Sequence, residues 1–445
     1  MNDKYPVGVI GLGKLGMPFM FACAWAGYST LGYDLRPEAR RLRPQDWEHE
    51  AGMTRDHAHM GVSIEAAPEA LERIDFAFDV ATVADLCDVI FVAVQTPHDP
   101  AYGGHLPIVD EAKDFDYRYV ESVLAQLAKA LRANGRKAAI ALISTVLPGT
   151  YQARFKEILD GLPFYYVPQF IAMGTVLPDF TSSQEPILVG RPDDEQDVLL
   201  KPQAVLRDLR LMGGGSRDLA LMSVASAEVG KIAYNTWISA KIGLTNNLAM
   251  VCDVVPSADA GDVAKFLARC SQRITGPAYM KPGMGDGGGC HPRDNIAMTW
   301  FASQKNLYAD VAGHVMEWRD AHALDLAAEL RGLAKVYEMK VVQLGTSFKA
   351  DHPSEDGSHA KLVAHYLGSA LHSTIDPVVS KHQARLFDPV ALPNEPVILF
   401  HAVDHACFRQ PFKVVPGSVF FTVHHDYPVE WLECIGVQVI VYGRG

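Results

Sequence analysis

The stretch Val7-Gly-Val-Ile-Gly-Leu-Gly-Lys-Leu-Gly16 decides the fold of the N-terminal part of this chain. Its first four residues are largely apolar and predict a short strand. The glycines that follow have a Gly-x-Gly-x-x-Gly spacing, and the apolar stretch behind them, up to Ala26, favours a helix. Residues 29–33 then favour a second strand, which ends at Asp34. Strand, helix and strand in this order predict a βαβ unit.

The three glycines of this unit have the spacing that a dinucleotide site requires. Gly11 allows a tight turn, Gly13 lets the pyrophosphate approach the backbone, and Gly16 lets the helix pack closely, with its N-terminus facing the phosphates. Asp34 can accept hydrogen bonds from both adenosine ribose hydroxyls and would repel a 2′-phosphate, which favours NAD over NADP, although nearby arginines weaken this preference. A glycine-rich turn without a ligand is the alternative, but strand, helix, second strand and acidic residue all coincide here. We therefore predict a site for NAD.

Strand-like and helix-like runs alternate beyond this unit. Apolar runs at 89–94, 138–143 and 187–189 predict strands with helices between several of them, which favours a mostly parallel, doubly wound sheet. Long helical patterns follow, and then four strand-like runs at 341–344, 397–400, 419–423 and 437–442. The predicted fold class is α/β, with an N-terminal Rossmann domain (1–215), a helical middle domain (216–335) and a smaller Rossmann-like α/β domain (336–445).

The composition limits the classes of function. Of the 445 residues, 49% are hydrophobic and 21% are charged, so the chain should fold throughout. The formal net charge of −12 is spread along the chain, which argues against binding to nucleic acids or anionic membranes. No apolar run reaches the roughly 18 residues that span a bilayer. The cysteines are widely spaced without a Cys-x-x-Cys pair, which disfavours disulfides and a metal site and indicates a reducing, cytoplasmic location.

A second glycine-rich segment, Gly283-Met-Gly-Asp-Gly-Gly-Gly-Cys-His-Pro-Arg-Asp294, contains a candidate nucleophile. Its glycines allow the backbone to approach a ligand closely, and a helix should begin just after Cys290, at about Pro292. A thiol near a helix N-terminus and beside Arg293 has its thiolate favoured, as a nucleophile requires. Buried filler is the usual role of a cysteine, and we assign it to the other six. The glycine-rich setting makes Cys290 the exception.

A third segment, Ala227-Glu-Val-Gly-Lys-Ile-Ala-Tyr-Asn235, has a helical pattern. Lys231 and Asn235 are four residues apart and therefore lie on one face of such a helix. Because pairs of this kind are usually solvated at the surface, this segment indicates little by itself.

Together these segments resemble the UDP-glucose/GDP-mannose family of nucleotide-sugar 6-dehydrogenases, over nearly the whole chain and in the same order. The matching segments are Gly11 to Gly16, Val94-Gln-Thr-Pro97, Ser144-Thr-Val-Leu-Pro-Gly149, Lys231 with Asn235, Gly287 to Asp294, and Phe348-Lys349. The resemblance implies NAD, a nucleotide-sugar substrate, a homodimer paired through the helical domain, and two successive hydride transfers. The alcohol would become an aldehyde, and a Cys290 thiohemiacetal would become a thioester that water hydrolyses to a uronic acid.

The resemblance also implies roles for individual residues. The implied catalytic residues are Cys290, Lys231, Asn235, Asp294, Thr145 and Gln169. The implied NAD contacts are Gly11, Gly13, Lys14, Leu15, Gly16, Asp34, Thr96, Pro97, Ser144 and Thr145. The implied substrate contacts are Phe170, Lys231, Asn235, Arg273, Tyr279, Lys281, Gly285, Phe348 and Lys349. The lysine ammonium would stabilise the developing oxyanion, with the neighbouring asparagine as a neutral donor.

Three segments depart from the family's pattern. Its Pro-Glu-Phe-Leu-x-Glu reads Pro168-Gln-Phe-Ile-Ala-Met173 here, and the amide of Gln169 cannot take a proton at neutral pH. Its Phe-Lys-x-x-Thr-x-Asp-x-Arg ends in Asp356 rather than arginine, and its late Asp-Gly-Arg is replaced around Thr422-Val-His-His425. The loss of such charges weakens binding of a diphosphate, so the substrate need not be UDP-glucose.

Two alternatives stay open from the sequence. One is a two-electron dehydrogenase that stops at the aldehyde, because Gln169 replaces the family's base. The other is a non-catalytic homologue that keeps the fold and binds NAD. The 3-hydroxyacyl and 6-phosphogluconate dehydrogenases also join a Rossmann domain to a helical domain, but neither needs a thiol or explains the third domain.

Overall fold

The computed structural model describes residues 5–41, 68–97, 114–172, 174–191, 198–276, 282–288, 291–379 and 392–443. It divides into two compact units, one up to Ser239 and one from Ala240 onward. Three of the predicted site residues, Tyr279, Lys281 and Cys290, lie outside the described residues.

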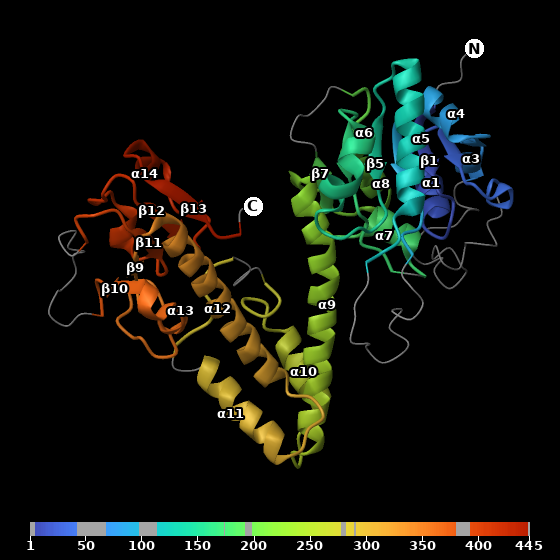
Figure 1. The fold of residues 1–445 in the computed structure, drawn as a ribbon. Helices are drawn as coiled ribbons and strands as arrows, with labels where there is room; N and C mark the ends of the chain where they lie inside the picture. Colours follow the sequence, from blue (N-terminus) through green and yellow to red (C-terminus); the bar gives the residue numbers. More distant parts are fainter. Residues whose placement is uncertain are drawn as a thin grey trace. The chain divides into compact units, whose positions relative to one another are not determined.

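The first unit alternates strands and helices (Figure 1). In chain order its elements are β1 (Tyr5–Ile10), α1 (Gly16–Trp25), β2 (Thr30–Tyr33), η1 (Pro37–Ala39), α3 (Pro68–Leu71), β3 (Ile74–Phe76), α4 (Val80–Leu86), β4 (Cys87–Val92), α5 (Arg118–Asn134), β5 (Ala139–Leu142), η6 (Tyr151–Phe155), α6 (Lys156–Leu159), β6 (Phe164–Tyr166), α7 (Val176–Ser182), β7 (Ile187–Arg191), α8 (Pro202–Gly213) and β8 (Leu219–Ser223).

These strands form one sheet in the order β3-β2-β1-β4-β5-β6-β7-β8. Every neighbouring pair is parallel except β6 and β7. Successive residues of a strand face opposite sides of a sheet, and helices cover both sides here. Phe91 packs with α1, whereas Ile90 and Val92 pack with α4 and α5. The strand order reverses between β1 and β4, where α/β sheets bind ligands beyond the carboxyl ends of their strands.

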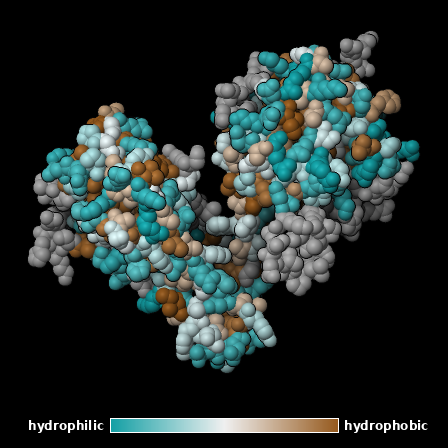
Figure 2. All heavy atoms as spheres, in the orientation of Figure 1, coloured by the Kyte–Doolittle hydropathy of each residue, from teal (hydrophilic) through white to brown (hydrophobic). Residues whose placement is uncertain are grey.

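Long helices follow the first sheet. They are α9 (Val224–Asp253), α10 (Ala260–Ala268), α11 (His291–Gln304) and α12 (Val311–Tyr337). They confirm the predicted helical middle region and the helix predicted to begin close to Pro292. Several large apolar side chains of this region are exposed, among them Trp237 and Trp300. Figure 2 shows brown, hydrophobic atoms at the surface in the part of the molecule that α10 and α11 occupy in Figure 1.

The second unit ends in a smaller sheet. Its elements are β9 (Val341–Leu344), α13 (His359–Leu367), η7 (Gly368–Ala370), β10 (Leu371–Ile375), β11 (Ile398–His401), η9 (Ala406–Arg409), β12 (Val419–Thr422), α14 (Glu430–Cys434) and β13 (Gln438–Val441). The sheet has the order β10-β9-β11-β12-β13 and is parallel throughout the described strands. Apolar residues of α12 and α13 pack on one of its faces.

The predicted fold class is therefore confirmed: a parallel α/β sheet, a helical middle region and a second, smaller parallel sheet. The strand β8 comes after residue 215 and still belongs to the first sheet, because it pairs with β7. The domain boundaries after residues 215 and 335 stay a proposal. No helix in the described ranges combines the length and the apolar character needed to cross a membrane.

Candidate functional site

The glycine-rich turn after β1 is shaped by close backbone contacts. Gly11 has φ +94°, and a Cβ there would lie 2.8 Å from the carbonyl of Ala93. A Cβ on Gly16 would lie 1.7 Å from the carbonyl oxygen of Gly11. Gly13 differs, because a Cβ there would meet nothing within 4 Å. The two outer glycines thus close the turn, while the middle one faces open space in front of the N-terminus of α1, where a pyrophosphate would fit.

Asp34 follows β2 and faces this turn. Its Oδ2 accepts a hydrogen bond from the backbone N–H of Leu12 at 2.8 Å, and its Oδ1 accepts one from the N–H of Arg36 at 2.9 Å. The Arg36 guanidinium also contacts Oδ1, at 3.2 Å. Burial alone would raise the pKa of Asp34, but these hydrogen bonds outweigh it and lower the pKa. We call Gly11, Leu12 and Asp34 the first corner.

Two exposed apolar side chains near the first corner were missed by sequence reasoning. Leu35 follows β2 and is 78% exposed, and Phe78 follows β3 and is 87% exposed. Both come after neighbouring strands at the edge where the first corner lies. Arg40 links their segments, since Nη1 donates to the carbonyl of Phe78 at 3.2 Å and Nε donates to that of Asp34 at 2.6 Å. Each residue follows the end of a strand. A single exposed apolar residue is so common on protein surfaces that the sequence alone could not mark either one as part of a site.

The segments after β4 and β5 meet beside the switch point of the first sheet. The hydroxyl of Thr96 donates to the carbonyl of Thr145 at 2.8 Å, and the hydroxyl of Ser144 donates to the carbonyl of Val94. These side chains hold the two loops together. The structure thus brings together three of the implied cofactor residues, Thr96, Ser144 and Thr145. A fourth, Pro97, directly follows Thr96 in the sequence.

Lys231 is buried on α9 and has an oriented ammonium group. Its Nζ donates to the backbone carbonyl of Gln169 at 2.9 Å and lies 4.7 Å from the centre of the Phe170 ring. Burial lowers its pKa. The ring of Phe170 also packs against that of Tyr234, with 4.1 Å between the ring centres and a 37° tilt between the ring planes. These contacts fix the position of the ammonium group. Among the described residues, only one of its N–H groups has a hydrogen-bond acceptor, so the others can stabilise a negative oxygen.

Gln169 and Asn235 differ in how they are held. The side-chain nitrogen of Gln169 donates to the carbonyl of Val167 at 2.8 Å, which anchors the amide. Asn235 lies one helical turn beyond Lys231 on α9 and is exposed. The structure therefore brings Gln169, Phe170 and Lys231 into contact, with Asn235 on the same helix.

Glu228 is a further residue of this region that sequence reasoning missed. Its carboxylate is buried and accepts hydrogen bonds from the backbone N–H groups of Gly149 and Tyr151, at 2.7 and 2.8 Å. It thereby fixes the loop after β5, which contains Ser144 and Thr145. The signal available in the sequence was an acidic residue three positions before Lys231 on the same predicted helix.

In the second unit, three of the implied substrate residues line one cavity. Gly285, Phe348 and Lys349 surround a space of about 120 Å³ at the carboxyl ends of β9 and β11. Residues after these strands, including Ala402 and Asp404, complete its wall. This is the position where the strand order of the second sheet reverses. Arg273 and Asp294 are exposed, and Asp294 accepts a hydrogen bond from the neighbouring Arg293 at 2.9 Å.

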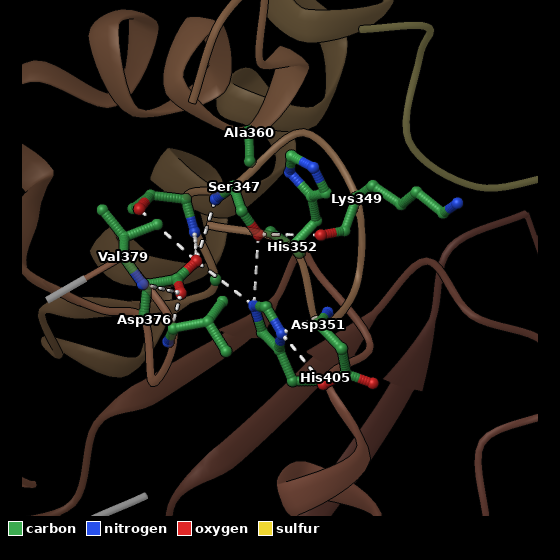
Figure 3. Close-up of polar contacts among 12 residues, drawn as sticks. Ser347, Lys349, Asp351, His352, Ala360, Asp376, Val379 and His405 are labelled. Carbon is green, nitrogen blue, oxygen red and sulfur yellow. Dashed lines mark hydrogen bonds and ion pairs between the residues drawn. The ribbon is translucent and has the colours of Figure 1, made fainter. Parts of the chain in front are cut away.

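A second corner, formed by Gly345, Thr346 and Asp376, resembles the first, because Gly345 has the same φ of +94° as Gly11 and the N–H of the next residue again donates to an aspartate. Figure 3 shows the polar contacts of Asp376 in this corner. Asp376 Oδ2 accepts hydrogen bonds from the N–H groups of Thr346 and Ser347, at 2.7 and 2.8 Å, and from Nε2 of the buried His405 at 3.2 Å. Burial would raise the pKa of Asp376, but these bonds outweigh it and hold the pKa well below its usual range.

His405 is not a general base for the nearby Ser347 hydroxyl. Its Nδ1 accepts a hydrogen bond from the N–H of Asp351 at 2.9 Å, so the proton is on Nε2, the atom that faces Ser347 and Asp376. The histidine therefore donates, and the cluster fixes the loop instead of activating a nucleophile.

Two parts of the chain match the domains of one known protein family. Residues 5–202 match the NAD binding domain of the UDP-glucose/GDP-mannose dehydrogenase family, and residues 225–320 match its central domain. A putative UDP-glucose 6-dehydrogenase of Bacillus subtilis is 26% identical over 286 residues, which cover 62% of this chain and 60% of that relative. A UDP-glucose 6-dehydrogenase of Haloferax volcanii is 23% identical over 398 residues, covering 86% of each chain.

A solved structure supports the fold over nearly the whole chain. The crystal structure of a ternary complex of GDP-mannose dehydrogenase from Pseudomonas aeruginosa matches with a TM-score of 0.73 at 18% identity, covering 97% of this chain and 99% of that one. Together with the two domain matches and the glycine turn that leaves room for a pyrophosphate, these likenesses lead to one conclusion. The chain belongs to the UDP-glucose/GDP-mannose dehydrogenase family, and its cofactor is NAD.

Proposed function

We propose that this protein oxidises the 6-hydroxyl of a nucleotide sugar to a uronic acid through a covalent adduct on Cys290. The named relatives act on UDP-glucose or GDP-mannose, which supports a sugar nucleotide as the substrate class. The observation that carries the proposal is the buried, oriented ammonium of Lys231 on the same unit as the NAD-binding turn. A dehydrogenase of an alcohol needs such a charge where an oxyanion develops.

The residues of the chain have distinct tasks in this proposal. When bound, NAD accepts a hydride from the substrate carbon. Lys231 stabilises the negative oxygen at that carbon, with Asn235 as a neutral donor beside it. The Cys290 thiolate adds to the aldehyde carbon to form a thiohemiacetal, and loss of a second hydride to another NAD, with loss of the hydroxyl proton, leaves a thioester. Water then cleaves the thioester, which releases the acid and regenerates the thiol.

Hydrolysis of the thioester is proposed to proceed without a carboxylate at position 169. Gln169 cannot accept a proton at neutral pH, and its amide is anchored to the carbonyl of Val167. Asp294, four residues after Cys290, is the alternative base, and Thr145 would help to place the water. Gln169→Glu should therefore speed release of the acid if deacylation limits turnover, and should reduce any acyl-enzyme seen by intact-protein mass spectrometry.

The substrate is proposed to bind in the cavity of the second unit, against Gly285, Phe348 and Lys349. Arg273, Tyr279 and Lys281 stay predicted contacts, as does Phe170. Screening UDP- and GDP-sugars with NAD and following NADH by absorbance tests the activity directly. Two NADH per sugar and a Cys290→Ala variant that yields no acid are expected. One NADH per sugar would instead support an enzyme that stops at the aldehyde, and no turnover of any sugar nucleotide would contradict the proposal.

A homodimer through α9 is proposed as well. Trp237 is 61% exposed on this helix, and Leu244, seven residues further along, is also exposed. Residues seven apart lie on one side of a helix, and an apolar side of this kind is expected to be covered. Sedimentation should give a dimer at micromolar concentration, and Trp237→Glu should shift it towards the monomer. A monomeric wild type would contradict this. The cytoplasmic location stays a prediction.

A further inference from the structure

The glycine-rich segment that precedes Cys290 packs closely on residues 348–359, which run from the loop after β9 to the first residue of α13. A Cβ on Gly285 would lie 2.4 Å from the ring of His359, and one on Gly287 would lie 2.9 Å from Cβ of Phe348. The N–H of Gly288 donates to the carbonyl of Asp356 at 3.0 Å. The described part of this segment, 282–288, contains a single charged residue, Asp286. These close contacts hold the described segment in place up to Gly288, which lies two residues before Cys290 in the sequence.

Arg319 on α12 fixes Asp286 and the facing segment at once. Its Nε donates to Oδ1 of Asp286 at 2.8 Å, and its Nη2 donates to the carbonyl of Gly357 at 2.7 Å. Its own carbonyl oxygen lies 3.1 Å from Nε2 of His359. The Arg319 side chain is 10% exposed, so the ion pair is only partly screened by water. The other carboxylate oxygen of Asp286 lies 3.9 Å from Nδ1 of His291, the first described residue after Cys290.

We infer that Arg319 and Asp286 form a positioning pair for the nucleophile of this enzyme. Neither is proposed to touch the substrate. The guanidinium fork is rigid and joins two segments, which a lysine ammonium cannot do in the same geometry. The inference rests on the proposed role of Cys290. If the pair sets the approach of the thiol, its loss lowers the rate of adduct formation by about tenfold or more, because small misplacements of reacting groups have effects of this size.

The test measures two properties of the full-length protein and its variants. The first is the rate at which iodoacetamide alkylates Cys290, read from the corresponding peptide by mass spectrometry. The second is kcat together with the KM for NAD. Arg319→Ala and Asp286→Asn should each lower the alkylation rate and kcat by about tenfold, with the KM for NAD within about twofold, and Arg319→Lys should recover part of the loss. The double variant should be little worse than either single variant, because the two residues act as one unit.

Arg331 provides the matched control, because it lies on the same helix and donates to the carbonyl of Tyr366, not to the glycine-rich segment. Arg331→Ala should leave the alkylation rate and kcat within about twofold, even if it lowers the melting temperature. The inference is overturned if Arg319→Ala loses stability but keeps both rates, or if kcat falls while the alkylation rate of Cys290 does not.

Failure of the proposed function would look different from failure of this inference. If alkylation of wild-type Cys290 left turnover intact, the thiol would not be the nucleophile. The alkylation rates of the variants would still decide whether the pair positions the segment. If Arg319→Ala does not fold, Asp286→Asn carries the test, since it keeps the arginine and removes only the charge of its partner.

Discussion

The first and second corners of this molecule share a backbone design and differ in what their carboxylates bind. Gly11 and Gly345 both have φ +94°. The N–H of Gly11 donates to the last carbonyl of β2, and the N–H of Gly345 donates to the last carbonyl of β10. In each case an aspartate follows that neighbouring strand and accepts the N–H of the residue after the glycine. The two sheets thus begin with the same turn.

The difference lies in how far protein groups saturate the carboxylate. The described donors to the Asp34 carboxylate are two backbone N–H groups and the exposed Arg36 guanidinium, and the Asp34 side chain is 10% exposed. Asp376 accepts four backbone N–H groups, including those of Val378 and Val379, as well as the buried His405, and its side chain is 3% exposed. One corner therefore keeps acceptor capacity for a ribose, while the other uses its carboxylate to hold its own loops.

The largest expected effect comes from the glycines of the first corner. Gly16→Ala should destabilise the first unit by about 3 kcal/mol, because the added Cβ would lie 1.7 Å from a carbonyl oxygen. Gly13→Ala should change stability by less than about 0.5 kcal/mol, since nothing lies within 4 Å, yet weaken NAD binding about tenfold or more. Urea unfolding and calorimetric titration of NAD measure the two effects. Equal loss of stability in both variants would contradict the proposed division of tasks.

Asp376→Asn should have the next largest effect, on stability. Removal of the charge weakens several hydrogen bonds in a buried cluster, which costs about 2 kcal/mol at neutral pH. The pKa of Asp376 is lower in the folded protein than in the unfolded chain, where it is about 3.9. The carboxylate therefore contributes its full stabilisation of the folded state above the pKa of the unfolded chain. This contribution is lost as the pH falls from there through the pKa of the folded protein. The difference in unfolding free energy between wild type and variant should therefore shrink below about pH 4. A difference that stays constant down to pH 2 would refute this.

Asp34→Asn should act on cofactor choice more than on stability. The variant no longer repels a 2′-phosphate, and Arg36 loses its partner, so the ratio of kcat/KM for NADP to that for NAD should rise about tenfold, or about 1.4 kcal/mol. Asp376→Asn is the control and should leave this ratio unchanged. If the wild type already uses both cofactors equally well, Asp34 does not discriminate between them.

Phe78→Ala should have the smallest effect. The exposed ring follows β3, the strand beside β2, and offers an aromatic face to the adenine of NAD, so its loss should weaken NAD binding by about 0.5 to 1 kcal/mol, or two- to fivefold. Tyr308→Ala, an exposed aromatic of the second unit, is the control. The same Kd for NAD in both variants would remove Phe78 from the cofactor site.

The strands and the first corner were predictable because their signals are local. The spacing of Gly11, Gly13 and Gly16 and the strand end at Asp34 lie within one βαβ unit. The second corner was not predictable, since it lacks the glycine fingerprint: the helix after β9 begins only at His359, whereas α1 begins at Gly16. Its similarity to the first is visible only in backbone angles and hydrogen bonds.

The candidate site was predictable only in part, for a similar reason. Lys231 could be chosen from its motif, but its contact with the carbonyl of Gln169 joins residues 62 positions apart. Glu228 and Arg319 also bond to backbone groups far away in the sequence, the N–H of Gly149 and the carbonyl of Gly357. No residue type in the sequence indicates such a contact. Sequence patterns report side chains, and these contacts are made to the main chain.

Calorimetric titration of NAD into the full-length protein tests most directly whether the first corner alone holds the cofactor. One NAD should bind per chain, Gly13→Val should abolish that binding, and Asp376→Asn should leave its stoichiometry and Kd unchanged. Two NAD molecules per chain, or binding that survives Gly13→Val and is lost in Asp376→Asn, would contradict the assignment.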